Sequence, residues 1–382
     1  MIRGLSLLAL VTLIACSSDE PSPVPSPTPG APGRFVYVAS VSPGAIRSYR
    51  IATDGTPTPV GEVAFDGTGS PNGLVLDVRG GWLWAPVAGG RGGIRAFAID
   101  RASGMLRELT GSPLDIDREP DTLVAAPTGA FLFAVRFAHP GVQTLAVEAS
   151  GSLVPVTGGS IATPASVSAA PFPHPSGRFL HVCFIEPEGI GTYLVNTVNG
   201  ILTPMGPLSA VPAWPFSITE DPSGRFVYVT TNASNFSQDT LVLYSIDPGS
   251  GSLARVPGSA FDPVFDLYLA DISPARVTFD PTGARAYVAD RPGRTGARSR
   301  GYWVFPVQSS GRLGPTRLGP FTTEGGDPVA LALDPAGRFA YVIDQFAARL
   351  QAFALDPATG ALSPRGAPVP TGSLPTTLVV GS

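Results

Sequence analysis

A string of about eleven residues recurs along the chain, and it limits the possible folds more than any other feature. Clear copies are DPSGRFVYVTT from Asp221, DPTGARAYVAD from Asp280 and DPAGRFAYVID from Asp334. Alignment on the glycine of this string gives seven units, at Gly33, Gly80, Gly129, Gly177, Gly224, Gly283 and Gly337. Successive glycines are 47 to 59 residues apart. This period exceeds that of most helical repeats and is typical of the four-stranded blade of a β-propeller.

Each unit contains short apolar segments rich in β-branched and aromatic residues, separated by Gly, Pro, Asp and Ser. In the last unit these segments are VALALD (329–334), RFAYVI (338–343), LQAFALD (350–356) and a shorter ALSPRG. No stretch shows a convincing helical period. We therefore predict an all-β, seven-bladed β-propeller over residues 33–382, with four antiparallel strands per blade and about 28 strands in all.

The two ends of the repeat region predict how the ring closes. The first unit begins at GRFVYV and lacks the strand that should precede it, whereas the chain ends with LPTTLVVGS, which resembles that strand. Pairing of residues 375–380 with residues 34–39 would complete the first blade and remove an exposed sheet edge.

One aromatic-sized position recurs in every unit, and it accounts for one of the three histidines. Its residues are Tyr37, Trp84, Phe133, His181, Tyr228, Tyr287 and Tyr341, which we expect to pack between neighbouring sheets. His174 replaces the Asp of the DPxG turn, so we interpret it as a turn residue. Cys183 is expected to be a buried, inert thiol. Only His139, in RFAHPG, has no place in the repeat.

The N-terminus is typical of an exported lipoprotein. Arg3 precedes the apolar run LSLLALVTLIA, which is too short to span a bilayer. The run ends in LIAC, so we predict a signal peptide over residues 1–15, lipidation of Cys16, a Pro-rich linker over 16–32 and an outer-membrane location. An ordinary secretory signal or an uncleaved anchor is the alternative. The lipid would make the membrane one partner of the protein.

The net charge of −4 gives no indication of a nucleic-acid partner. The chain has three histidines, and two of them, His174 and His181, are expected to have structural roles. Too few ligands remain for a zinc site, so we expect no metal. The sequence has no P-loop, no Rossmann glycine pattern and no GxSxG elbow. We therefore predict no cofactor, and we expect a monomer.

The connections that vary between units should lie together at one end of the ring, where binding residues are expected. The longest are residues 231–239, 260–275 and 290–301. The last contains Arg291 and Arg294, whose guanidinium groups could bind a carboxylate or phosphate. A solvated loop is the alternative interpretation of this arginine cluster.

The units resemble the lactonase-type seven-bladed propellers, the family of bacterial 6-phosphogluconolactonase and fungal carboxymuconate cyclases. The resemblance covers residues 33–382 and depends on DPSGRFVYV, DPAGRFAYV and the hairpins IDPGSGSLARV and LDPATGALSPR. It implies lactone hydrolysis by charged residues at the channel. The family's P-R-H is replaced here at Ala213 and Trp214, its N-E by Thr231 and Asn232, and a later Arg by Val329. Asp290 and Arg291 match a family D-R step.

These substitutions lead to our functional prediction: a cell-envelope binding or interaction scaffold without lactonase chemistry, whose ligand is a small molecule, a peptide or an envelope component. The alternative is a hydrolase that opens a lactone at the central channel mouth, for which His139 and Glu186 would be substitute catalytic groups. The candidate ligand-binding residues are Arg291, Asp290, Trp214, Asn232, Arg294, His139 and Glu186.

Overall fold

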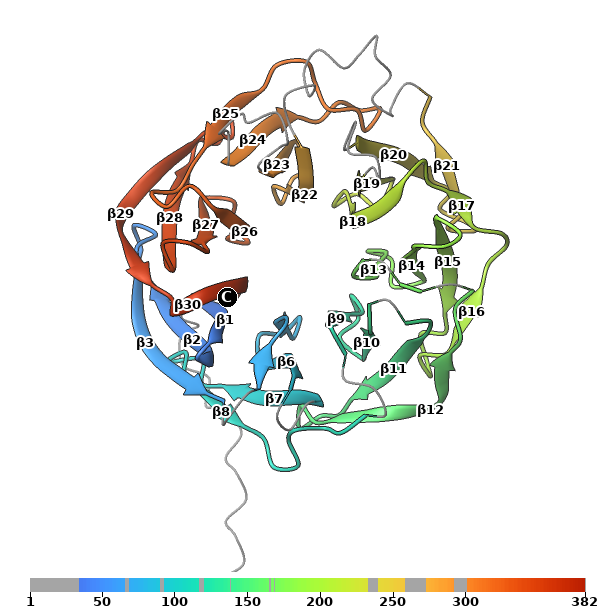
Figure 1. The fold of residues 1–382 in the computed structure, drawn as a ribbon, viewed down its shortest axis with the longest axis horizontal. Coiled ribbons are helices and arrows are strands. Elements are labelled where there is room, and N and C mark those ends of the chain that lie inside the picture. Colours follow the sequence, from blue (N-terminus) through green and yellow to red (C-terminus); the bar gives the residue numbers. More distant parts are fainter. Residues whose placement is uncertain are drawn as a thin grey trace, which may run out of the picture.

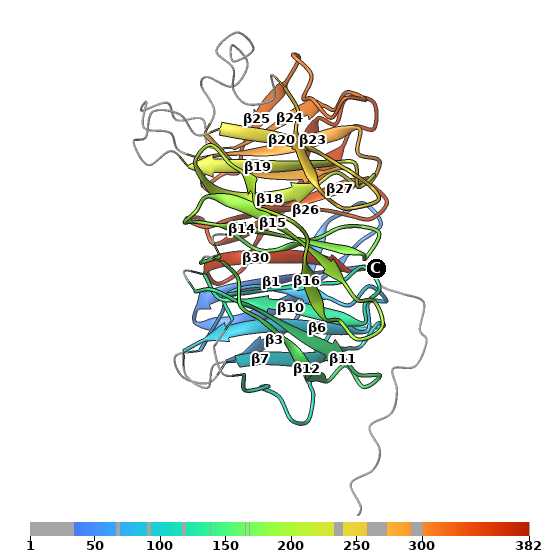
Figure 2. The same ribbon diagram turned by 90° about the vertical axis from the view of Figure 1, so that its right-hand side faces the viewer.

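The structure is a computed structural model that describes residues 34–381, except 66–68, 90–92, 117–119, 138, 165, 168, 233–239, 258–272 and 292–300. Seven antiparallel sheets stand around a central axis as the blades of a propeller (Figure 1). Seen from the side, the ring is a disc (Figure 2). Every regular element within these ranges is a strand. The described residues form no apolar helix long enough to cross a bilayer.

The blades share one order, in which the strands follow the chain from the axis outward. The strands of blades one to three are β30 (Ser373–Gly381), β1 (Phe35–Ser42), β2 (Gly44–Ile51) and β3 (Pro57–Ala64); β4 (Ser70–Pro71), β5 (Val75–Leu76), β6 (Trp82–Ala88), β7 (Gly93–Ile99) and β8 (Leu106–Glu108); β9 (Thr122–Ala125), β10 (Phe131–Val135), β11 (Val142–Val147) and β12 (Leu153–Ile161).

The strands of blades four to seven are β13 (Phe172–Pro173), β14 (Phe179–Phe184), β15 (Gly189–Val195), β16 (Leu202–Pro204) and β17 (Ser209–Ala210); β18 (Trp214–Glu220), β19 (Phe226–Asn232), β20 (Thr240–Ile246) and β21 (Leu253–Arg255); β22 (Ser273–Phe279), β23 (Arg285–Arg291), β24 (Gly301–Pro306) and β25 (Leu318–Phe321); β26 (Pro328–Leu333), β27 (Phe339–Asp344), β28 (Arg349–Leu355) and β29 (Leu362–Pro370).

The predicted seven-bladed architecture with four strands per blade is confirmed, and in two blades one of these strands is interrupted. The inner strand of blade two is split into β4 and β5, and the outer strand of blade four into β16 and β17. Pro71 and Gly73 interrupt the first, and Gly206 and Pro207 the second. Proline has no N–H for the ladder, and Gly206 has a φ of 71°, which a strand cannot contain.

The C-terminal strand closes the ring as predicted. β30 pairs antiparallel with β1, with Phe35 opposite Gly381 and Ser42 opposite Ser373. The last strand of the chain is therefore the inner strand of the first blade, and β1 has no free edge.

At five of its seven positions, the repeated aromatic residue donates a hydrogen bond to the next blade. The Tyr341 hydroxyl donates a hydrogen bond to the Gly55 carbonyl, 3.1 Å away, across the closing junction between blades seven and one. The same bond recurs in four other blades, from Trp84 to Gly151, His181 to Gly251, Tyr228 to Gly311 and Tyr287 to Gly360. The Phe133 side chain cannot donate a hydrogen bond. At this junction the Thr144 hydroxyl donates to the Gly200 carbonyl instead, 3.1 Å away. The predicted packing between sheets is confirmed.

The acceptor glycines have positive φ and end the hairpin between the third and fourth strands. A phenylalanine of the preceding blade packs on such a glycine: a Cβ at Gly251 would lie 2.6 Å from the Phe179 ring. The repeat motif therefore encodes the junction between blades, because glycine supplies both the turn and the space for the ring.

The structure confirms the structural roles predicted for two histidines and the cysteine, His181, His174 and Cys183. His181 is buried, with Nδ1 2.6 Å from Glu220 Oε1 and Nε2 bonded to the carbonyl of Gly251. His174 lies in its turn, with Nδ1 2.7 Å from Ser176 Oγ. Cys183 is a free, buried cysteine, and burial raises the pKa of its thiol well above the usual range. Only His139 remains free for other chemistry.

The ring has two different ends. The turn after each inner strand and the hairpin after each third strand lie at one end, the turn face, because the strands of a blade alternate in direction. The connections between second and third strands, and those between blades, lie at the other end, the loop face. The described chain begins at Arg34 on the turn face, since Phe35 pairs with the last residue of β30.

Candidate functional site

Four of the predicted ligand-binding residues occupy strand ends at the loop face in blades five and six. Trp214 begins β18 and pairs with Asn232 at the end of β19, while Asp290 and Arg291 end β23. The side chains of Asn232 and Arg291, and all of Arg294, lie outside the described residues. The predictions for these three side chains therefore remain predictions.

Asp290 is buried and holds a neighbouring side chain. Its Oδ2 accepts a hydrogen bond of 3.3 Å from the indole N–H of Trp303. The guanidinium of Arg317 lies 4.1 Å from the centre of the Trp303 ring. These contacts give Asp290 a role in packing this end of blade six.

Several large apolar side chains are exposed at the loop face, at strand ends and turns of blades one, five and seven. Trp214, Phe346 and Leu374 are exposed here, at 45%, 70% and 47% of their full surface. Arg276 is exposed on β22, an inner strand.

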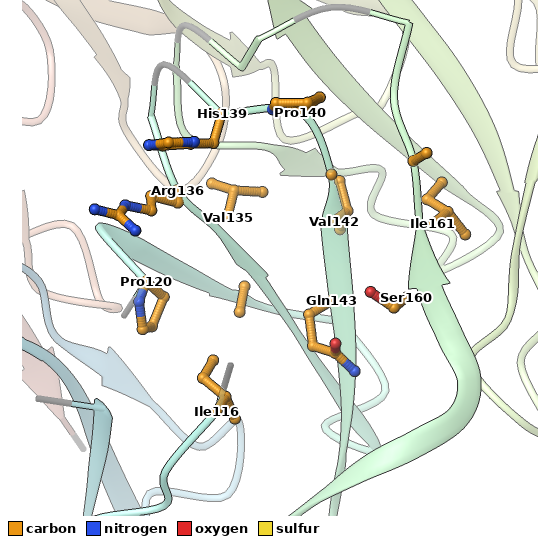
Figure 3. A pocket seen from close by; sticks show the side chains of 13 residues that line it. Ile116, Pro120, Val135, Arg136, His139, Pro140, Val142, Gln143, Ser160 and Ile161 are labelled. Atoms are coloured by element: carbon orange, nitrogen blue, oxygen red, sulfur yellow. The ribbon is translucent and has the colours of Figure 1, made fainter. Parts of the chain in front are cut away.

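A pocket of roughly 320 Å³ lies at the loop-face end of blade three (Figure 3). Its walls come from the ends of β10, β11 and β12 and from the connection that leads from blade two into blade three. Thirteen residues line it: Ile116, Pro120, Ala134, Val135, Arg136, His139, Pro140, Gly141, Val142, Gln143, Ser160, Ile161 and Ala162.

Arg136 and His139 are the basic residues of this pocket. Their side chains extend from one wall in the same direction (Figure 3). Both are exposed, and neither side chain makes a hydrogen bond or ion pair with another residue in the described ranges. A guanidinium and an imidazole without partners among the described residues are available to bind an anion or to move a proton.

The backbone that carries these two side chains is held by hydrogen bonds on both sides. Phe137 N–H donates to Asp121 Oδ2 at 2.6 Å, and His139 N–H donates to the Arg136 carbonyl at 3.3 Å. The His139 carbonyl accepts from Val167 N–H of blade four at 3.2 Å. The segment is therefore fixed between blades three and four, which positions the basic pair for a ligand.

Gln143 and Ser160 add neutral polar groups on the opposite wall, where they face each other across β11 and β12. The Gln143 amide nitrogen donates to the Thr144 carbonyl at 3.2 Å, so its oxygen is the atom that can serve a ligand. Glu186 is exposed in the turn between β14 and β15 of the next blade, and it does not line this pocket.

The structure therefore brings one predicted residue, His139, together with three that the sequence did not indicate: Arg136, Gln143 and Ser160. His139 was recognisable because the repeat did not account for it, whereas no motif marks the other three. A group of three or more His, Cys, Asp or Glu side chains able to hold a metal ion is absent from the described part of the chain.

Comparison with known proteins agrees with this architecture. A family model described as lactonase, 7-bladed beta-propeller, matches residues 259–379. The 6-phosphogluconolactonase of Bacillus subtilis is 25% identical over 284 residues, which cover 72% of this chain and 77% of the relative.

Two solved structures share the fold over nearly the whole ring. The periplasmic gluconolactonase PpgL of Pseudomonas aeruginosa has 21% identity and a TM-score of 0.72, over 92% of this chain and 99% of its own. A putative 6-phosphogluconolactonase from Bacteroides uniformis has 18% identity and a TM-score of 0.72, over 91% and 99%.

The ring of seven four-stranded blades defines the class, a seven-bladed β-propeller. Within that class, the family match over residues 259–379 and the Bacillus relative show that the chain is similar to the lactonase-type seven-bladed β-propellers.

Proposed function

We propose that this protein is a lactone hydrolase and that the blade-three pocket is its active site. Similarity to the lactonase-type family supports the reaction class. The observation that carries the location is the unpartnered pair of Arg136 and His139 in a pocket of ligand size. The similarity to lactonases favours this function over the non-catalytic scaffold expected from the sequence.

Each basic residue has a defined task in ring opening. His139 accepts a proton from water as the water oxygen bonds to the lactone carbonyl carbon. The guanidinium of Arg136 stabilises the negative oxygen that develops on that carbon. The bond from the carbonyl carbon to the ring oxygen then breaks, and His139 returns the proton to that oxygen. The product is a hydroxy acid, whose carboxylate the guanidinium can hold.

Binding without turnover is the second candidate function, and one specific observation favours it. The positions at which the family places charged groups are occupied here by Ala213, Trp214 and Val329. A chain that lost those groups and kept an anion pocket would bind a hydroxy acid without producing it.

Ring-opening assays distinguish the two functions. Purified protein is mixed with δ-gluconolactone, 6-phosphogluconolactone and dihydrocoumarin, and acid release is followed with a pH indicator. We expect protein-dependent acid release, saturable in substrate, from at least one lactone. Rates that match the spontaneous hydrolysis of all three would contradict the proposed enzyme and favour the binding protein.

We also propose that the protein is anchored to the cell envelope through Cys16. The signal-like residues 1–15 and the Pro-rich residues 16–32 support this. The described chain begins on the turn face, so the anchor would leave the pocket pointing away from the membrane. Cells grown with labelled palmitate should label the wild type and not Cys16→Ser. An unlabelled wild type would contradict the anchor.

A further inference from the structure

We infer that the blade-three pocket selects lactones and hydroxy acids with an apolar body, such as aryl-fused or alkyl-substituted lactones, over polyhydroxylated sugar lactones. The catalytic part of this inference rests on the proposed function, whereas the binding preference does not. The preference follows from which groups the pocket presents and which of them are still free to bind.

Most of the described residues that line the pocket have no polar side-chain atom. Nine of the thirteen lining residues are Ile, Val, Pro, Ala or Gly, with Ile116 and Pro120 on one side and Val142 and Ile161 on the other (Figure 3). An apolar ligand body placed between these walls loses its contact with water, which is favourable in proportion to the area covered.

The backbone of the walls offers few further partners to hydroxyl groups. Val142 pairs with Ile161 and Gln143 with Ser160 in the ladder between β11 and β12. Gly141 N–H, which precedes that ladder, donates to Thr163 Oγ1 at 2.8 Å. These main-chain groups are already occupied within the sheet and its end.

A sugar lactone brings several hydroxyls, each of which needs a partner when water is removed. The free groups are the Arg136 donors, the His139 ring, the Ser160 hydroxyl and the Gln143 amide oxygen. Among the lining residues that the structure describes, none is a carboxylate that could accept from vicinal hydroxyls. Each buried hydroxyl left without a partner loses its hydrogen bonds to water without replacement, which disfavours a polyhydroxylated ligand.

The arrangement of polar groups also defines how an apolar lactone would lie. Arg136 and His139 share one side of the pocket, and their nitrogen-bearing ends point away from Val142 and Ile161 (Figure 3). The carbonyl or carboxylate end of a lactone would therefore lie at that side, with the body along the apolar lining residues. A volume of roughly 320 Å³ is at the small end of ligand sites, which span roughly 300 to 1,000 Å³. A single fused ring system or a short alkyl lactone is of this size.

The test compares two acids and their lactones. Calorimetry measures binding of 3-(2-hydroxyphenyl)propionate and of gluconate, the ring-opened forms of dihydrocoumarin and δ-gluconolactone. Acid release gives kcat/KM for both lactones. We expect the aryl acid to bind at least about ten-fold more tightly than gluconate, and dihydrocoumarin to have the higher kcat/KM. Gluconate binding as tightly as the aryl acid would overturn the inference.

Two variants link the preference to the pocket wall. Ile116→Ser should weaken binding of the aryl acid about ten-fold, because an apolar contact is lost. Val154→Ser changes an exposed valine on β12 outside the pocket and should leave binding unchanged. An Ile116→Ser protein that is folded by circular dichroism and binds like the wild type would contradict the inference.

The outcomes separate this inference from the proposed function. Tight binding of the aryl acid without hydrolysis of any lactone contradicts the enzyme and supports the pocket preference. Faster hydrolysis of δ-gluconolactone than of dihydrocoumarin supports the enzyme and contradicts the preference. Absence of both binding and hydrolysis contradicts both.

Discussion

Deletion of residues 373–382 is expected to abolish cooperative folding of the whole ring. The deleted segment contains β30, which is the inner strand of blade one and pairs with β1 along its length. Without it, β1 becomes a free inner edge, and blade seven no longer packs against a complete neighbour. We expect an aggregated protein, or one whose thermal transition is broad and shifted down by more than about 10 °C.

The size of the expected effect follows from what β30 buries. Leu378 is buried in the cluster that joins blades one and seven, with Val380 packed against it, and Val379 packs in the cluster with blade two. Burial of each large apolar side chain contributes about 1.5 to 3 kcal/mol, and domains are stable by only about 5 to 15 kcal/mol. The loss of three such side chains and a full ladder is therefore comparable with the total stability.

Two point variants on the same strand provide the controls, measured by calorimetric unfolding. Leu378→Ala should lower the free energy of unfolding by about 2 to 5 kcal/mol, because it leaves a cavity. Ser373→Ala, at an exposed position, should leave it within about 0.5 kcal/mol of the wild type. A truncated protein that unfolds at the wild-type temperature would show that β30 does not close the ring.

His139→Gln is expected to lower kcat for ring opening by about 10² to 10⁴, the usual contribution of a general base. Glutamine keeps a polar side chain of similar length but cannot accept a proton at neutral pH. The backbone of residue 139 is bonded to Arg136 and Val167, and both bonds are independent of the side chain. The fold should therefore be retained, and the loss should appear in kcat more than in KM.

The matched control for this variant is Glu188→Gln. Glu188 is exposed in the turn between β14 and β15 and does not line the pocket, so its substitution should leave kcat unchanged. Retention of more than half of the wild-type kcat by His139→Gln would show that the base lies elsewhere on the ring.

The fold could be predicted from the sequence because its main contacts repeat. The glycine that ends each hairpin and the aromatic residue that bonds to it recur at one period, so even the distant pair of Tyr341 and Gly55 follows from the repeat. The split strands at Pro71 and Gly206 escaped prediction because single proline and glycine residues interrupt a ladder without changing the period.

The candidate site could be predicted only in part. His139 was identifiable because the repeat left it without a structural role, as the buried contacts of His174 and His181 confirm by contrast. Arg136, Gln143 and Ser160 join it only through the register of β10, β11 and β12 and the path of the preceding connection. That convergence is a property of the folded blade, and no spacing in the chain encodes it.

The most direct test of the account is a crystal structure of the protein with bound 3-(2-hydroxyphenyl)propionate. We predict the carboxylate on the guanidinium of Arg136, the phenolic oxygen within hydrogen-bond distance of His139, and the ring against Val142 and Ile161. Density for the acid at the channel mouth, beside Trp214 or Arg276, with the blade-three pocket empty, would contradict it.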